Sequence, residues 1–91
     1  MFLHINQVSY LGDLRLRLWF NDGQVKDVDL KGDLHGEVFE PLQNQEIFQQ
    51  VKINPETQTV EWPNGADFAP EYLSEIGQTV SRVGIAHLQI M

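Results

Sequence analysis

The residues best able to do chemistry gather in one stretch of the chain, from Glu61 to Glu71. The carboxylates of Glu61, Asp67 and Glu71 lie near Trp62 in the sequence, and such a group could bind a cation or a basic partner. In the other interpretation Asn64 begins a tight turn, Asp67 caps the following helix or turn, and Trp62 lies in the core. That second interpretation is favoured, because the carboxylate spacing of a calcium or magnesium loop is absent.

Trp19 is a separate candidate. The alternation around it predicts that it lies beside Arg17 and near Asp27, on the strand face away from Leu14, Leu16 and Leu18. The favoured interpretation places it under the C-terminal tail or a helix. Otherwise Trp19 is an anchor for a partner, a role that aromatic residues often take at interfaces. The candidate binding surface is therefore Trp62, Asn64, Asp67, Glu71 and Trp19.

Other kinds of site find no support in the residue spacing. The histidines are isolated and lack metal-binding spacing: His4, His35 and His87. None of the serines lies in a G-x-S-x-G context, cysteine is absent, and no glycine-rich phosphate loop occurs. We therefore expect no catalytic residues, no metal site and no cofactor, and the sequence does not favour an enzyme.

Composition limits the kind of partner. The 91 residues carry 6 Lys and Arg against 13 Asp and Glu, a formal net charge of −7. This charge repels a phosphate backbone, so we expect no direct nucleic-acid binding and instead a basic protein partner. No apolar run reaches the roughly 18–20 residues that span a bilayer, so no membrane association is expected. With no cysteine and no signal-peptide pattern, a cytoplasmic location is predicted.

The elements that must position these residues begin with a hairpin. Leu14 to Phe20 alternates apolar and polar residues, as a strand with one buried face does, and Gln24 to Leu30 follows after a short turn. A two-residue loop would bury carboxylates in the apolar face. A three-residue loop with Gly23 in the left-handed conformation instead pairs Arg17 with Asp27. We predict this second register.

The other predicted elements are short: a strand over His4–Tyr10, a helix over Gln45–Gln50 capped by Asn44, a second hairpin over Val51–Trp62 with Pro55 in its turn, and a helix from Pro70 that ends at Gly77. The fold class is therefore α+β, a single compact domain. It contains an antiparallel sheet of about five strands in two hairpins, with the Leu14–Phe20 strand near the centre, and two short helices.

The sequence pattern of the C-terminal tail fits either a strand or a helix. We divide the chain into an α+β domain over residues 1–77 and an apolar tail over 78–91. Val83, Ile85 and His87 fit a strand, whereas Val80, Val83 and His87 fit a helical stripe. Because the tail is too apolar to remain exposed, it is expected to dock on the domain or on a second copy of the chain, which makes a homodimer possible.

Several segments together resemble a known family: Phe20-Asn21-Asp22-Gly23, Val28-Asp29-Leu30, the G-x-V-F-E-P-L run at Gly36–Leu42, Phe48, Val51, and the W-P-N-G-A-D-x-x-P-E run at Trp62–Glu71. Over roughly Phe2 to Glu75 the sequence resembles the bacterial domain-of-unknown-function family number 2442. The resemblance implies a compact α+β domain with no established catalytic residues. Some members are fused to a helix-turn-helix domain, and others are encoded beside a small partner, as in toxin–antitoxin pairs.

Too few residues follow Gly77 for a helix-turn-helix, which argues against DNA binding by this chain. These observations favour a non-enzymatic interaction module, antitoxin-like or regulatory, that engages a basic protein. The alternative is a small-molecule or cation-binding domain, possibly an enzyme, that uses the Trp62–Glu71 region.

Overall fold

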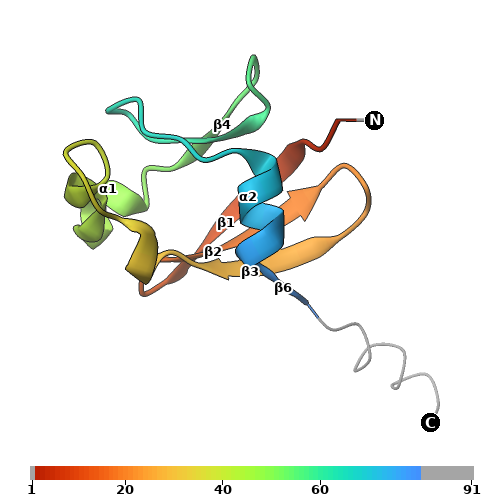
Figure 1. Cartoon of the computed structure of the whole chain (residues 1–91), viewed down its shortest axis with the longest axis horizontal. Helices are drawn as coiled ribbons and strands as arrows, with labels where there is room; N and C mark the ends of the chain where they lie inside the picture. The colour runs from red at the N-terminus through yellow and green to blue at the C-terminus, as the bar shows by residue number, and fades with distance from the viewer. Residues whose placement is uncertain (1, 81–91) are drawn as a thin grey trace, which may run out of the picture.

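A computed structural model of the protein describes residues 2–80 and contains two antiparallel sheets and two short helices (Figure 1). The elements run in the order β1 (Ile5–Gly12), β2 (Arg15–Phe20), β3 (Val25–Asp29), η1 (Lys31–Asp33), η2 (Glu40–Gln43), α1 (Gln45–Phe48), β4 (Lys52–Asn54), β5 (Thr59–Glu61), α2 (Pro70–Ile76) and β6 (Gln78–Thr79), where η denotes a 3-10 helix. The α+β prediction is confirmed.

The strands are divided between a sheet of order β1-β2-β3-β6 and the separate β4-β5 hairpin. The long excursion through η1, η2 and α1 brings this hairpin against β1, where the amide of Ile5 donates a hydrogen bond to the Gln58 carbonyl at 2.9 Å. The sequence predicted one sheet of about five strands, but the strands form two sheets, which meet at β1. The strand predicted to lie near the centre, β2, lies between β1 and β3.

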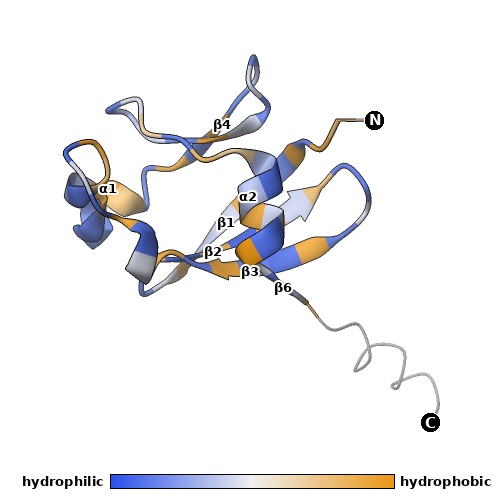
Figure 2. Ribbon diagram, viewed as in Figure 1, coloured by the Kyte–Doolittle hydropathy of each residue, from blue (hydrophilic) through white to orange (hydrophobic). Residues whose placement is uncertain are grey.

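The predicted register of the first hairpin is confirmed. Arg17 pairs with Asp27 and Leu16 pairs with Val28, while Gly23 in the loop has φ of +92°. Leu16, Leu18 and Phe20 are at most 3% exposed, so one face of β2 faces the core. Strand β3 does not repeat this alternation: Figure 2 shows hydrophobic bands near both of its ends with a hydrophilic stretch between them, and only Val28 is buried.

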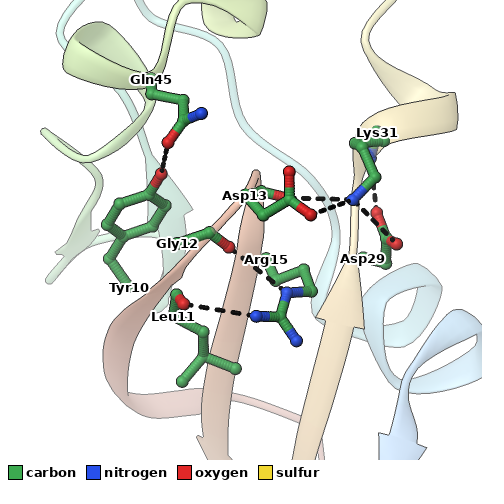
Figure 3. Close-up of polar contacts among 8 residues, drawn as sticks. All are labelled: Tyr10, Leu11, Gly12, Asp13, Arg15, Asp29, Lys31 and Gln45. Atoms are coloured by element: carbon green, nitrogen blue, oxygen red, sulfur yellow. Dashed lines mark hydrogen bonds and ion pairs between the residues drawn. The ribbon is translucent and has the colours of Figure 1, made fainter.

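The turn between β1 and β2 differs from expectation. Leu14 was predicted to begin the strand, but it and Asp13 have φ of +59° and +56°, so both belong to the turn. Positive φ at two successive residues is typical of the tight hairpin turn whose twist matches its strands. Polar contacts hold this turn: Lys31 Nζ lies 2.9 Å from Asp13 Oδ2, and the Arg15 guanidinium donates to the carbonyls of Leu11 and Gly12 (Figure 3).

The Arg17–Asp27 pair predicts a pH effect on stability. Arg17 Nε and Nη2 donate to the two Asp27 carboxylate oxygens at 2.7 and 3.0 Å, and these hydrogen bonds hold the pKa of Asp27 below its ordinary value of 3.8. A lowered folded-state pKa adds stability above the ordinary pKa, and that stability is lost as pH falls through the folded-state value.

We therefore expect Asp27→Asn to lower Tm slightly at pH 7, and we expect this difference to disappear as pH falls through the lowered folded-state pKa, because the wild-type carboxylate then becomes protonated as well. The effect is modest, since the two side chains are 38% and 35% exposed and solvent screens the pair. Thermal scans across this pH range measure it. The exposed hairpin carboxylate Asp22, changed to Asn, is the control; a Tm difference for Asp27→Asn that does not depend on pH would contradict the assignment.

Both helices are fixed by packing and by their ends. The Asn44 side chain accepts a hydrogen bond from the Glu46 amide, which confirms the predicted cap of α1. Helix α1 is shorter than expected and ends at Phe48. Helix α2 begins at Pro70, as predicted, and lies across the four-stranded sheet (Figure 1). Its Leu73 is fully buried, and Lys26 Nζ donates to the Ser74 carbonyl at 2.8 Å.

The first residues of the predicted tail join the domain. Gln78 and Thr79 form β6, which pairs antiparallel with β3, and the Val80 amide donates to the Val25 carbonyl at 2.8 Å. Residues 81–91 lie outside the described residues, so the docking of the tail and the homodimer stay predictions. No helix within residues 2–80 is long and apolar enough to cross a membrane.

Candidate functional site

Trp62, the centre of the predicted site, is a core residue. It is 1% exposed, and its indole Nε1 donates to the Phe48 carbonyl at 2.7 Å. Its ring also contacts those of Phe48 and Phe68, at centroid distances of 5.4 and 6.0 Å. Trp62 therefore supports the neighbouring surface from beneath, and a bound molecule would not reach it.

The polar atoms of Asn64 are occupied within the fold. Its Oδ1 accepts from the Ala66 amide at 3.0 Å, and its Nδ2 donates to the Val38 carbonyl at 2.9 Å. The predicted tight turn is present: the Gly65 amide donates to the Trp62 carbonyl, and Gly65 has φ of +90°, a conformation that glycine adopts without strain. Asn64 thus ties this turn to the segment that contains Val38.

Asp67 and Glu71 are exposed, as a partner-binding role requires. One interpretation of the sequence expected Asp67 to cap α2, but it does not. The cap position is Ala69, which makes no side-chain capping bond, and the backbone of Asp67 instead forms an isolated β-bridge with Glu61. The Glu61 carboxylate accepts from Nδ2 of Asn54, so Glu61 is already engaged. Glu71 lies in the first turn of α2, where a negative charge is favourable.

Trp19 is separated from the rest of the predicted surface. It lies on β2 between Gln7 of β1 and Val25 of β3, and it is half-buried. Because Leu18 and Phe20 face the core, the alternation along β2 turns Trp19 to the opposite face of the sheet. A partner bound at Asp67 and Glu71 would therefore not contact Trp19 through the same surface.

The structure adds an aromatic feature that the sequence analysis missed. Phe39, Phe68 and Tyr72 form a continuous row, which we call the aromatic ridge. The ring centroids of Phe39 and Phe68 are 4.9 Å apart, and Phe68 and Tyr72 stack at 5.9 Å. Tyr72 is 38% exposed, and its hydroxyl donates to the Asp33 carboxylate. This hydrogen bond raises the pKa of Tyr72, because it stabilises the protonated phenol beside a negative charge.

Two members of the ridge are close in the sequence, since Phe68 comes just before the helix that begins at Pro70 and Tyr72 lies in its first turn, so their contact could have been suspected. Phe39 gave no signal, since it is 29 residues from Phe68 in the sequence. Nothing in a local pattern relates residues that far apart.

Negative charge is concentrated in the part of the chain that builds the ridge. Residues 33–80 contain nine carboxylates and one basic residue, Lys52, whereas residues 1–32 contain four carboxylates and four basic residues. The three ion pairs found within residues 2–80 involve Asp13, Asp27 and Asp29, which all belong to the balanced part. The carboxylates around the ridge thus have no cation partner among the described residues.

A surface hollow lies elsewhere, between β3 and the end of α2. It is lined by Arg15, Asp27, Val28, Asp29, Ile76 and Gln78. None of these residues belongs to the Glu61–Glu71 segment. The hollow and the predicted site are therefore different places on the molecule.

Comparison with known families bears on the fold and the identity of the chain. The model of a family described as "Protein of unknown function (DUF2442)" matches residues 5–78. The chain belongs to the DUF2442 family. The match runs from the first residue of β1 to the first residue of β6, so the DUF2442 domain includes both sheets and α2. No curated protein and no solved structure matches the DUF2442 chain.

Proposed function

We propose that this DUF2442 protein is a non-enzymatic interaction module, regulatory or antitoxin-like, that engages a basic protein partner. The uneven charge is the observation that carries the proposal. Nine carboxylates against one lysine over residues 33–80 give this part of the domain a strongly negative field. Such a field speeds the approach of an oppositely charged protein and repels nucleic acid.

The exposed carboxylates Asp67 and Glu71 extend this proposal to a surface. Both follow the Asn64–Gly65 turn, whose hydrogen bonds fix the chain that presents them. A fixed presentation lowers the conformational entropy lost on binding.

The alternative, a small-molecule or cation-binding domain on Trp62–Glu71, has weaker support. Trp62 is 1% exposed, Asn64 is bonded at both ends of its amide, and residues 2–80 hold no cluster of three or more metal-ligating side chains. A thermal-shift screen with divalent cations and metabolites tests it, because a specific ligand raises Tm by mass action.

The main test is an affinity capture from host lysate with three forms of the tagged protein: the wild type, an Asp67→Asn/Glu71→Gln variant, and an Asp22→Asn/Glu56→Gln control. Each variant loses two negative charges, but Asp22 and Glu56 lie in hairpin turns. We expect the wild type and the control to retain one basic protein in stoichiometric amount, identified by mass spectrometry. The site variant should retain several-fold less.

Added salt should release the partner, because mobile ions screen exposed charges beyond about 10 Å at 0.1 M ionic strength. Recovery of the DUF2442 chain alone at low salt would contradict the proposal. Equal loss of the partner from both double variants would show that Asp67 and Glu71 are not part of the binding surface. It would still support a general role of negative charge in binding.

A further inference from the structure

The aromatic ridge joins three parts of the chain, with Tyr72 exposed and Phe39 and Phe68 partly buried against the core. Phe39 precedes η2, Phe68 precedes α2, and Tyr72 lies within α2. Phe68 and Tyr72 are nearly parallel, with an angle of 16° between their planes, and Phe39 is tilted by 34° from Phe68. The described residues include three exposed large hydrophobic side chains, and two of them belong to or adjoin the ridge: Tyr72, and Val38 next to Phe39.

The ridge is held in place from below and from one end. The ring of the buried Trp62 meets Phe68 edge-on, at an angle of 82°. At the other end, the hydrogen bond to Asp33 fixes the Tyr72 hydroxyl. Rings held in this way keep their orientation without a ligand, so binding costs little side-chain entropy.

Carboxylates stand beside the exposed ring. Asp33 contacts the Tyr72 hydroxyl, and Glu75 lies close enough for its charge also to raise the pKa of Tyr72. Neither carboxylate takes part in an ion pair among the described residues. The ridge therefore combines an aromatic face with negative charge that no cation of residues 2–80 neutralises.

This combination suits one side chain above others. The planar guanidinium of arginine stacks on an aromatic face and donates two hydrogen bonds in parallel to a carboxylate. Lysine offers a compact charge that does not stack and is more strongly hydrated. An apolar side chain would gain from the rings but would leave the carboxylates without a partner.

Resting on the proposed function, we propose that the aromatic ridge receives an arginine side chain of the basic partner, which stacks on Tyr72 and pairs with Asp33 or Glu75. The ridge thereby selects arginine over lysine within a surface that otherwise recognises positive charge. This assigns the specificity of the interaction to Phe39, Phe68 and Tyr72, and its long-range attraction to the surrounding carboxylates.

The test uses two synthetic peptides of equal length, nona-arginine and nona-lysine, titrated into the full chain at low salt. Aromatic and amide NMR signals report where each peptide binds. We expect nona-arginine to shift the signals of Phe39, Phe68 and Tyr72 and to bind at least about threefold more tightly than nona-lysine.

Two changes of the same residue separate the ring from the fold. Tyr72→Phe keeps the ring and should bind nona-arginine within about twofold of the wild type, whereas Tyr72→Leu should lose about three- to tenfold. Asp33→Asn removes the charge but keeps a side-chain oxygen that can accept the Tyr72 hydrogen bond, so it should reduce the preference for arginine while the ring stays in place. Thermal scans establish that each variant is folded, and Asp33→Asn provides a test that does not depend on Tyr72→Leu.

Three results would overturn the inference: equal affinity for the two peptides, unchanged affinity in Tyr72→Leu, or shifts confined to carboxylates away from the ridge. With any of these, a basic partner captured from lysate would still support the proposed function. If neither peptide binds at low salt, the ridge is not an arginine site, and the capture experiment alone decides whether a basic partner exists.

Discussion

Replacement of Trp62 by alanine is expected to lower the free energy of unfolding by about 3–5 kcal/mol, the usual cost of removing a large buried aromatic side chain. Domains of this size have only about 5–15 kcal/mol in total. Trp62 is 1% exposed, and it joins the β4-β5 hairpin to α1 through the hydrogen bond from its indole to the Phe48 carbonyl. Its loss leaves a cavity and removes the shorter of the two hydrogen bonds that the Phe48 carbonyl accepts, the other coming from the Val51 amide at 3.2 Å.

Thermal and chemical unfolding measure this change, and Tm should fall by more than about 12 °C. Trp19→Ala is the matched control, because it makes the same substitution at a half-buried position, on the face of β2 that points away from the core. Trp62→Phe should show an intermediate loss of about 1–3 kcal/mol, since it keeps a ring but loses the indole hydrogen bond to the Phe48 carbonyl. Similar losses for Trp62→Ala and Trp19→Ala would contradict the assignment of Trp62 to the core.

Gly77→Ala is expected to cost about 1–3 kcal/mol, although alanine favours helices. Gly77 follows α2 with φ of −77°, so it is not needed for a left-handed conformation, as a glycine at a helix end often is. The substitution is unfavourable because there is no room for a Cβ atom at this position. A Cβ atom at this position would lie 2.9 Å from the Leu73 carbonyl oxygen and 3.1 Å from atoms of Lys26 and Val28.

Denaturant unfolding gives the stability loss, and amide exchange shows where it acts. Because Gly77 leads directly into β6, exchange of the Val80 amide, which is bonded to the Val25 carbonyl, should become faster. Gly32→Ala is the control: nothing lies within 4 Å of a Cβ there, and its φ is not left-handed. We expect that substitution to change stability by less than about 0.5 kcal/mol. Equal effects at the two glycines would show that α2 does not pack closely on β3.

These two positions show that part of the Trp62–Gly77 region is needed to stabilise the fold. Its tryptophan, its turn and its final glycine each satisfy a packing or hydrogen-bonding requirement. The exposed residues between them, Asp67, Glu71 and Tyr72, remain available for contact. A motif of this kind can thus build the fold and present a surface at the same time.

Features governed by neighbouring residues were predictable. The alternation of Leu14–Phe20 and the need to keep Asp27 out of the core were enough to choose the hairpin register, because a shift of one residue exchanges the two faces of a strand. Asn44 was recognised as a cap because its side chain bonds an amide two residues away.

Features that depend on folding over the sequence were missed or wrong. The division into two sheets depends on how distant segments meet, because the β4-β5 hairpin reaches β1 only after the excursion through α1. The position of Leu14 in the turn is a local feature that its alternation with Leu16 and Leu18 concealed. For the candidate site, Asp67 and Glu71 are exposed, and their role in binding stays a prediction. The burial of Trp62 agrees with the favoured interpretation of the sequence, in which this residue lies in the core.

The α+β class, the hairpin register, the net charge and membership in a family can all be inferred from the amino-acid sequence, since each follows from local periodicity, composition or a continuous motif. The folded structure was needed to show that Phe39 contacts Phe68, that Asp33 contacts Tyr72, and that Asp67 and Glu71 are exposed beside the buried Trp62. Those contacts join residues that are far apart in the chain, and they form because hydrophobic burial brings together whichever surfaces pack, whatever their order in the sequence.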